Sequence, residues 1–283
     1  MKNNIKTAGL LAVLGSLCVV IGSAIGGQRG LYFGTIFGLI AVASSYWMSD
    51  KLAIASARAQ EVSEAQFPQY YATVRELCTR ADLPMPRLYI APNPQPNAFA
   101  TGRNPKHAAV CINEGLIESL TWDEIAGVLA HELSHVKNRD ILTSAVAAAI
   151  GTVISSLAQM AMWASVFSGG GGRDREGTNP LGALLMMVLG PIAAMFIQSA
   201  ISRSREFEAD ASAARLLGTG EPLARALEKL EFGAQRIPVN INPNQASAYI
   251  VNPLSARQAM SKMFSTHPPM EERIARLRGG EWH

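Results

Sequence analysis

The sequence carries little charge for its length. Of its 283 residues, 17% are Asp, Glu, Lys or Arg and 48% are hydrophobic, whereas soluble domains average about 25% charged residues. The formal net charge is only +3, so nothing in the composition indicates a nucleic-acid partner. Such a composition is typical of a membrane protein or of a domain with a very apolar core, and the distribution of the apolar residues decides between them.

Cysteine is also scarce. The chain has three, Cys18, Cys78 and Cys111, and no two of them form a CxxC pair. An odd number without a regular spacing argues against a disulfide scaffold and a cysteine-ligated metal, and it is typical of a reducing compartment.

Four long segments contain no charged residue at all. They are Thr7–Gly27, Gly30–Met48, Ile141–Phe167 and Leu181–Ile201. Each reaches the roughly 18–20 residues that a helix needs to cross a bilayer. A short Gly-Gly-Gln-Arg turn joins the first two segments, and a Gly-rich charged loop separates the last two. We therefore predict four transmembrane helices arranged as two hairpins.

Two alternatives stay open for these segments. The first could be a cleaved signal peptide with Lys2 and Lys6 as its basic start, although the apolar segment that follows at once favours an uncleaved anchor. The last two could form a buried hairpin of a soluble domain. For a spanning protein, Lys and Arg gather in the segment 51–140 and after Ile201, which places both termini and the polar segments in the cytoplasm.

The predicted organisation has four parts. Residues 1–50 form the first membrane hairpin, 51–140 a polar region, 141–202 the second hairpin and 203–283 a second polar region. In the first polar region, the segments Arg87–Ala91, Asn97–Gly102 and His107–Asn113 have the composition of short strands. We expect them to form a small antiparallel sheet. The fold class is a mainly α integral membrane protein with an α+β domain.

A metal-binding motif follows the predicted strands, in "LAHELSHV". His131 and His135 are four residues apart, so a helix places both imidazoles on one face, where they can bind one zinc ion. Glu132 points about 100° away and is suited to take a proton from water. Thr121 and Glu124 have the spacing of a capping box that begins this helix. The motif predicts a hydrolytic zinc site.

The motif leaves the third protein ligand of a hydrolytic zinc site unidentified. His107, His267 and His283 are candidates, but a carboxylate in "SRSREFEAD" fits better. Glu206 and Asp210 are four residues apart on one helical face, whereas Glu208 lies on the opposite face and should be solvent-exposed. Glu206 could bind the metal while Asp210 hydrogen-bonds a ligand histidine.

Taken together, "PNAFATG", "HELSH", "SRSREFEAD" and "HPPMEERI" occur in an order that resembles the HtpX-type membrane zinc metallopeptidases, relatives of the CAAX prenyl endoprotease. The resemblance covers nearly the whole chain. It implies a gluzincin-like zinc peptidase domain on the cytoplasmic face of a bacterial inner membrane, one Zn²⁺ on His131, His135 and Glu206, and Glu132 as the catalytic base.

The resemblance also implies roles for residues outside the metal motif. The edge strand that contains Asn97, Ala98, Phe99 and Ala100 would bind the substrate backbone. His267 and Arg273 would be candidates to stabilise the oxyanion, although His267 could instead cap a helix and Arg273 could be a surface charge.

The implied function is zinc-dependent endoproteolysis of misfolded or damaged membrane proteins, with protein substrates and the lipid bilayer as partners. Two alternatives remain: a CAAX-type protease acting on prenylated substrates, and a membrane scaffold with a non-catalytic zinc. Glu132 argues against the scaffold, because a purely structural zinc site has no use for a base and is closed by four protein ligands.

Overall fold

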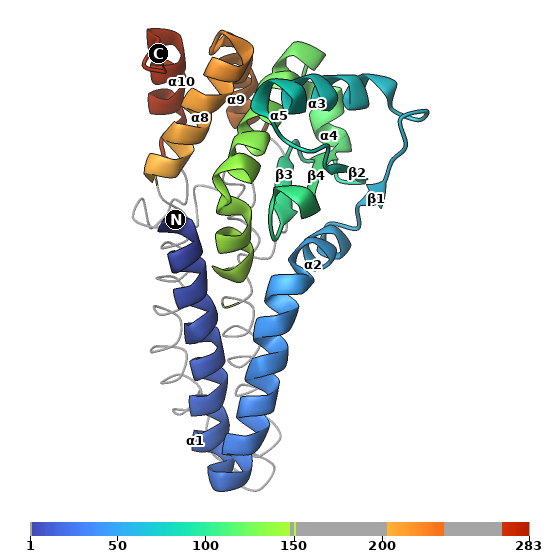
Figure 1. Cartoon of the computed structure of the whole chain (residues 1–283). Helices are drawn as coiled ribbons and strands as arrows, with labels where there is room; N and C mark the ends of the chain where they lie inside the picture. Colours follow the sequence, from blue (N-terminus) through green and yellow to red (C-terminus); the bar gives the residue numbers. More distant parts are fainter. Residues whose placement is uncertain (1, 148–149, 151–202, 235–267, 283) are drawn as a thin grey trace, which may run out of the picture.

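The protein consists mainly of helices, with one small sheet (Figure 1). The structure is a computed structural model that describes residues 2–147, 150, 203–234 and 268–282. The described helices are α1 (Lys2–Trp47), α2 (Ser49–Ser56), α3 (Pro68–Ala81), α4 (Glu114–Ser119), α5 (Trp122–Asn138), α8 (Arg203–Leu217), α9 (Glu221–Ala234) and α10 (Met270–Gly279). The described strands are β1 (Gln60–Glu61), β2 (Arg87–Ala91), β3 (Ala98–Gly102) and β4 (Ala108–Asn113).

Helix α1 forms the predicted N-terminal hairpin. Gly27 has φ 53° and ψ −134°, a conformation outside the helical region that lets the chain reverse direction. The two arms lie side by side (Figure 1) and approach closely at glycines: a Cβ on Gly22 would lie only 2.4 Å from the carbonyl oxygen of Gly30. In the described part of the chain, one helix, Gly27–Trp47, is long and apolar enough to cross a membrane, and Ile5–Val20 is a shorter apolar helix.

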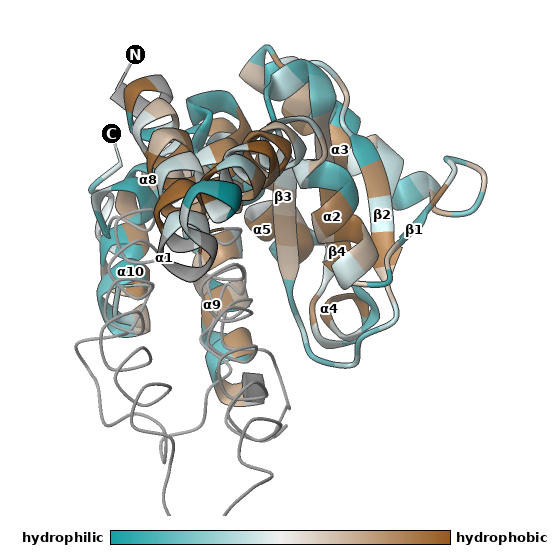
Figure 2. Ribbon diagram, turned by 90° about the horizontal axis from the view of Figure 1, so that it is seen from below, coloured by the Kyte–Doolittle hydropathy of each residue, from teal (hydrophilic) through white to brown (hydrophobic). Residues whose placement is uncertain are grey.

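Most large apolar side chains of the second arm of α1 are exposed, including Phe33, Phe37 and Leu39, which are 74%, 58% and 68% exposed. Such a surface is suited to lipid rather than water. The hydrophobic residues of α1 and α5 are brown in Figure 2. The segments 151–167 and 181–201 lie outside the described residues, so the count of four membrane helices stays a prediction.

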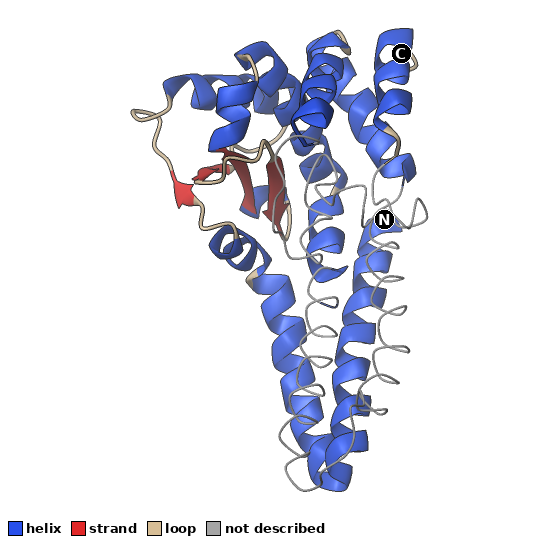
Figure 3. Ribbon diagram, turned by 180° about the vertical axis from the view of Figure 1, so that it is seen from behind, coloured by secondary structure: helices blue, strands red, loops and turns tan. Residues whose placement is uncertain are grey.

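The sheet, red in Figure 3, is mixed, and its strand order is β1-β2-β4-β3. The expectation of an all-antiparallel sheet was wrong, because β2 and β4 pair in parallel, with Arg87 opposite Ala109. After β2 the chain crosses the end of β4, runs back as β3 and turns into β4, so that β4 lies between β2 and β3. β4 is buried along its whole length because both faces of the sheet are covered there: Val110 and Ile112 belong to the main core, and Ala109 and Cys111 to a second cluster on the other face.

Helix α5 packs between the sheet and the C-terminal helices. It begins with the predicted capping box: the Glu124 N–H donates to Thr121 Oγ1, and the Thr121 N–H donates to Glu124 Oε2. Gly127 lets α9 approach, since a Cβ there would lie 2.6 Å from the backbone nitrogen of Leu223. The main core lies among α3, α5, α9 and the sheet, and it fixes α5 at the centre of the polar region.

Helix α2 connects α1 to the sheet. Only Met48 separates it from α1, and Asp50 of α2 forms an ion pair with Arg87 of β2. The hydroxyl of Thr101 in β3 donates to the backbone oxygen of Ser49 at 3.4 Å. The N-terminal hairpin is thereby attached to both β2 and β3.

Candidate metal centre

The two histidines of the HExxH motif point their Nε2 atoms toward each other. His131 and His135 lie one turn apart on α5, with their rings at 90°. Their Nε2 atoms are 3.2 Å apart, and the histidine side chains are 3% and 15% exposed. The spacing of the motif alone predicted this shared face.

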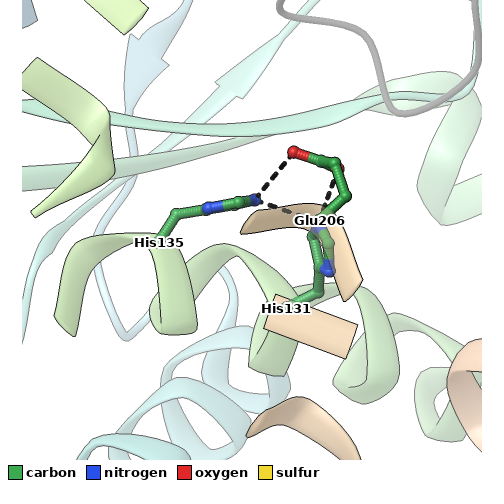
Figure 4. Close-up of side chains that lie close together, drawn as sticks. All are labelled: His131, His135 and Glu206. Carbon is green, nitrogen blue, oxygen red and sulfur yellow. Dashed lines mark hydrogen bonds and ion pairs between the residues drawn. The ribbon is translucent and has the colours of Figure 1, made fainter. Parts of the chain in front are cut away.

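Glu206 of α8 completes the group, as Figure 4 shows. Its Oε2 lies 3.7 Å from Nε2 of His131, and its Oε1 lies 3.6 Å from Nε2 of His135. One ligand atom from each of the three residues lies within 4.8 Å of the others. Segments far apart in the sequence therefore bring together the three residues expected to bind metal.

These residues fit a zinc ion. Two nitrogen ligands of one tetrahedral zinc lie about 3.3 Å apart, since each Zn–N bond is about 2.0–2.1 Å long, and the observed Nε2–Nε2 distance is 3.2 Å. Two histidines with one glutamate leave a fourth position open, which is typical of catalytic rather than structural zinc.

Glu132 lies beside the three candidate ligands and contacts the sheet. Its Oε2 accepts a hydrogen bond from the Ala100 N–H at 2.9 Å. Burial raises the pKa of Glu132, although positive charge on His131 and His135 would partly offset that effect. The carboxylate is therefore held by strand β3 within electrostatic range of His131, His135 and Glu206.

A chain of charged groups, here named the His131 arm, extends behind His131. Nδ1 of His131 lies 2.9 Å from Oδ1 of Asp210 in a bent contact. Arg273 of α10 donates to both oxygens of Asp210, at 2.8 and 2.7 Å. Burial alone would raise the pKa of Asp210, but Arg273 and His131 outweigh it and hold that pKa at about 2.

A second chain, the His135 arm, extends behind His135. Nδ1 of His135 lies 3.2 Å from Oδ2 of Asp140 in a hydrogen bond, and Nη1 of Arg205 lies 3.6 Å from Oδ1 of Asp140. Sequence analysis missed both Asp140 and Arg205. The available signal was an acidic residue just after the motif helix, together with an arginine next to Glu206.

The charges around the two imidazoles favour a bound cation. The pKa of His135 is raised to about 9: burial alone would lower it, but the hydrogen bond to Asp140 and the charges of Glu206 and Glu132 outweigh burial. A metal ion at the shared Nε2 position would meet the same negative field.

The other predicted site residues lie in different surroundings. Asn97 is 3% exposed, and its backbone oxygen accepts from the Asn113 N–H. Glu208 is exposed as predicted, and it pairs with Arg215. Arg273 is completely buried and hydrogen-bonds Asp210, so the alternative that it is a surface charge was wrong. His267 lies outside the described residues.

The chain matches known proteins over most of its length. The model of Peptidase family M48 matches residues 64–281. A protease HtpX homolog from Syntrophobacter fumaroxidans is 50% identical over 98% of this chain and 99% of the relative. Another, from Nostoc sp., is 51% identical over 98% of this chain and 96% of the relative.

A solved structure shares the fold. The crystal structure of S. mikatae Ste24p superposes with a TM-score of 0.53 at 20% identity, and the match covers 98% of this chain. This chain spans 65% of the length of Ste24p, and at this identity the likeness concerns the fold alone.

The site and these relatives define the class of protein as a membrane metallopeptidase. More narrowly, the chain belongs to peptidase family M48, and it is similar over its whole length to HtpX proteases. The family resemblance predicted from the sequence is confirmed.

Proposed function

We propose that this chain is a zinc-dependent endopeptidase with a gluzincin-like site. The observation that carries the proposal is the convergence of His131, His135 and Glu206 on one point, with Glu132 beside them. The donor set suits zinc, and the neighbouring carboxylate supplies the base that hydrolysis requires.

The chemistry follows from these positions. A zinc ion bound there would make water more acidic and polarise the carbonyl of the scissile peptide. Glu132 accepts the proton of the attacking water and later delivers it to the leaving amine. Its burial favours this role, because a raised pKa brings the carboxylate closer to the working pH.

We assign substrate binding to strand β3 and the residue before it, Asn97 to Ala100. β3 is the last strand of the sheet, so an extended peptide can add to its outer edge. The hydrogen bond between Ala100 and Glu132 supports this assignment, because it puts the outer edge of β3 next to the base.

Oxyanion stabilisation is assigned to His267 or Arg273. Nε and Nη2 of Arg273 are committed to Asp210, while its buried Nη1 has no hydrogen-bond partner among the described residues. If Arg273 contributes directly, Nη1 is therefore the donor.

We place the active site on the cytoplasmic side of a bacterial inner membrane that the chain crosses several times. The exposed apolar surface of α1 supports membrane insertion, and the Lys and Arg content of the polar regions supports this orientation. The proposed substrates are misfolded or damaged membrane proteins, and the proposed role is quality control.

The test is cleavage of an unfolded model protein by the purified chain in detergent. We expect a chelator to stop cleavage and added zinc to restore it. Glu132→Gln should keep one zinc per chain while cleavage falls by about 10²–10⁴-fold, and the exposed control Glu208→Gln should behave as the wild type. Wild-type cleavage by Glu132→Gln would refute the mechanism.

A further inference from the structure

Asp140 and Arg205 flank residues 141–202 in the sequence and meet in the structure. Asp140 follows Arg139, which ends α5 in the left-handed conformation. Arg205 lies in the first turn of α8, directly before Glu206. Their contact, 3.6 Å between Nη1 and Oδ1, connects the two ligand-bearing helices at the points where the intervening segment leaves and rejoins them.

The carboxylate of Asp140 contacts a different group through each oxygen. Oδ2 accepts from Nδ1 of His135 at 3.2 Å, while Oδ1 faces Arg205. The Asp140 side chain is 5% exposed and that of Arg205 is 14% exposed. Water and salt screen buried charges weakly, so this pair interacts more strongly than a surface pair.

These contacts determine how His135 meets the metal position. When Nδ1 carries the proton that Asp140 accepts, the lone pair of the ring is on Nε2, the atom that faces the other candidate ligands. Arg205 holds the carboxylate in this orientation. Because Arg205 precedes Glu206 on α8, the same ion pair also fixes the third ligand relative to α5.

We propose that Asp140 and Arg205 are a positioning pair that sets the metal affinity of the centre. Neither residue contacts the substrate or the reacting atoms; each acts through His135 or Glu206. The inference rests on the proposed zinc site. A matched pair that should lack this effect is Arg215–Glu208 on the same helix, whose side chains are 47% and 63% exposed.

The test is zinc affinity of the purified full-length chain in detergent, measured by competition with a chromogenic chelator. Asp140→Asn and Arg205→Gln should each weaken zinc binding by about 10–100-fold, the usual effect of removing a group that holds a ligand histidine. Arg205→Lys should recover most of the affinity because it keeps the charge. Arg215→Gln should bind zinc as the wild type does.

A double variant separates positioning from general damage. Because Arg205 acts through Asp140, the double variant Asp140→Asn/Arg205→Gln should bind zinc about as weakly as Asp140→Asn alone. Bound Co²⁺ should show an altered absorption spectrum in Asp140→Asn and Arg205→Gln but not in Arg215→Gln. Thermal unfolding of the metal-free proteins checks the fold, and Arg205→Gln, at the more exposed position, carries the test if Asp140→Asn does not fold.

The possible outcomes have distinct meanings. Single variants with zinc affinity within twofold of the wild type, or losses that add fully in the double variant, would overturn the positioning role. A wild-type chain that fails to bind one zinc would instead contradict the proposed metal centre itself.

Discussion

The two candidate histidine ligands lie one turn apart on α5, yet different parts of the chain hold them. The His131 arm ends on α10, where Arg273 is completely buried and binds the Asp210 carboxylate through two hydrogen bonds. The His135 arm ends on α8, where the Arg205 side chain is 14% exposed and lies 3.6 Å from its carboxylate. The first arm is the tighter and the more deeply buried.

The difference shows where each half of the centre obtains its rigidity. The His131 arm depends on α8 and α10, which pack around the C-terminal part of the core. The His135 arm depends on a contact between the two residues that flank the segment 141–202. Its geometry therefore depends on the position of α8 relative to the end of α5, whereas the His131 arm is fixed in addition by Arg273 of α10.

The largest effect should come from removing Glu206, the candidate ligand that contacts both histidines. Glu206→Ala leaves two histidines, too few for a stable zinc site, so we expect the loss of stoichiometric zinc in metal analysis together with the loss of cleavage. Glu208→Ala, which changes an exposed residue on the same helix, should keep both. If zinc were retained in Glu206→Ala but lost in Glu208→Ala, the third ligand would be Glu208 instead of Glu206.

Replacing Arg273 at the end of the His131 arm should destabilise the fold. Arg273→Met leaves the Asp210 carboxylate buried without its partner, and such losses amount to about 3–5 kcal/mol. Thermal unfolding of the metal-free protein in detergent should show a lower midpoint. Arg205→Gln should lower the midpoint less. Arg278→Gln breaks only part-exposed ion pairs with Glu221 and Glu228 and should have the smallest effect of the three. An Arg273→Met midpoint equal to that of the wild type would show that the pair is not needed for stability.

A milder change compares the two carboxylates directly. Asp210→Asn should weaken zinc binding by about 10–100-fold, because the amide holds the His131 ring less well. The zinc affinity of Asp210→Asn should be measured by chelator competition and compared with that of Asp140→Asn. A wild-type affinity in Asp210→Asn would mean that His131 is held in place by α5 alone.

The smallest effect should come from a substitution at the start of α5, the helix that carries both histidines. Thr121→Ala removes the capping box of α5, which should lower stability by about 1 kcal/mol. Zinc affinity should stay at the wild-type value, since neither arm is altered. A large loss of zinc affinity in this variant would show that the start of α5 also positions the histidines.

Local spacing was enough to predict which residues form the candidate metal site. His131 and His135 share a face because any helix puts residues four apart together, and Glu206 was preferred by the same argument. Asp140 was missed because it lies beyond the end of α5, where Arg139 turns the chain back toward His135. Helical periodicity says nothing about a residue after such a turn.

Contacts between distant segments were the hardest to predict. The strand Arg87–Ala91 was predicted with its observed bounds, but its parallel pairing with β4 depends on how the chain passes from β2 to β3. The burial of Arg273 depends on the packing of α10 against α8. Neither fact is encoded in the local pattern of either segment.

The attachment of α2 has a consequence for what the enzyme can reach. The apolar helix Gly27–Trp47 continues almost directly into α2, which is tied to β2 through Asp50 and to β3 through Ser49. With Gly27–Trp47 in the bilayer, as we propose, these contacts would keep the edge of the sheet near the membrane. A substrate bound at that edge, as we propose, would then come from chain lying close to the membrane surface.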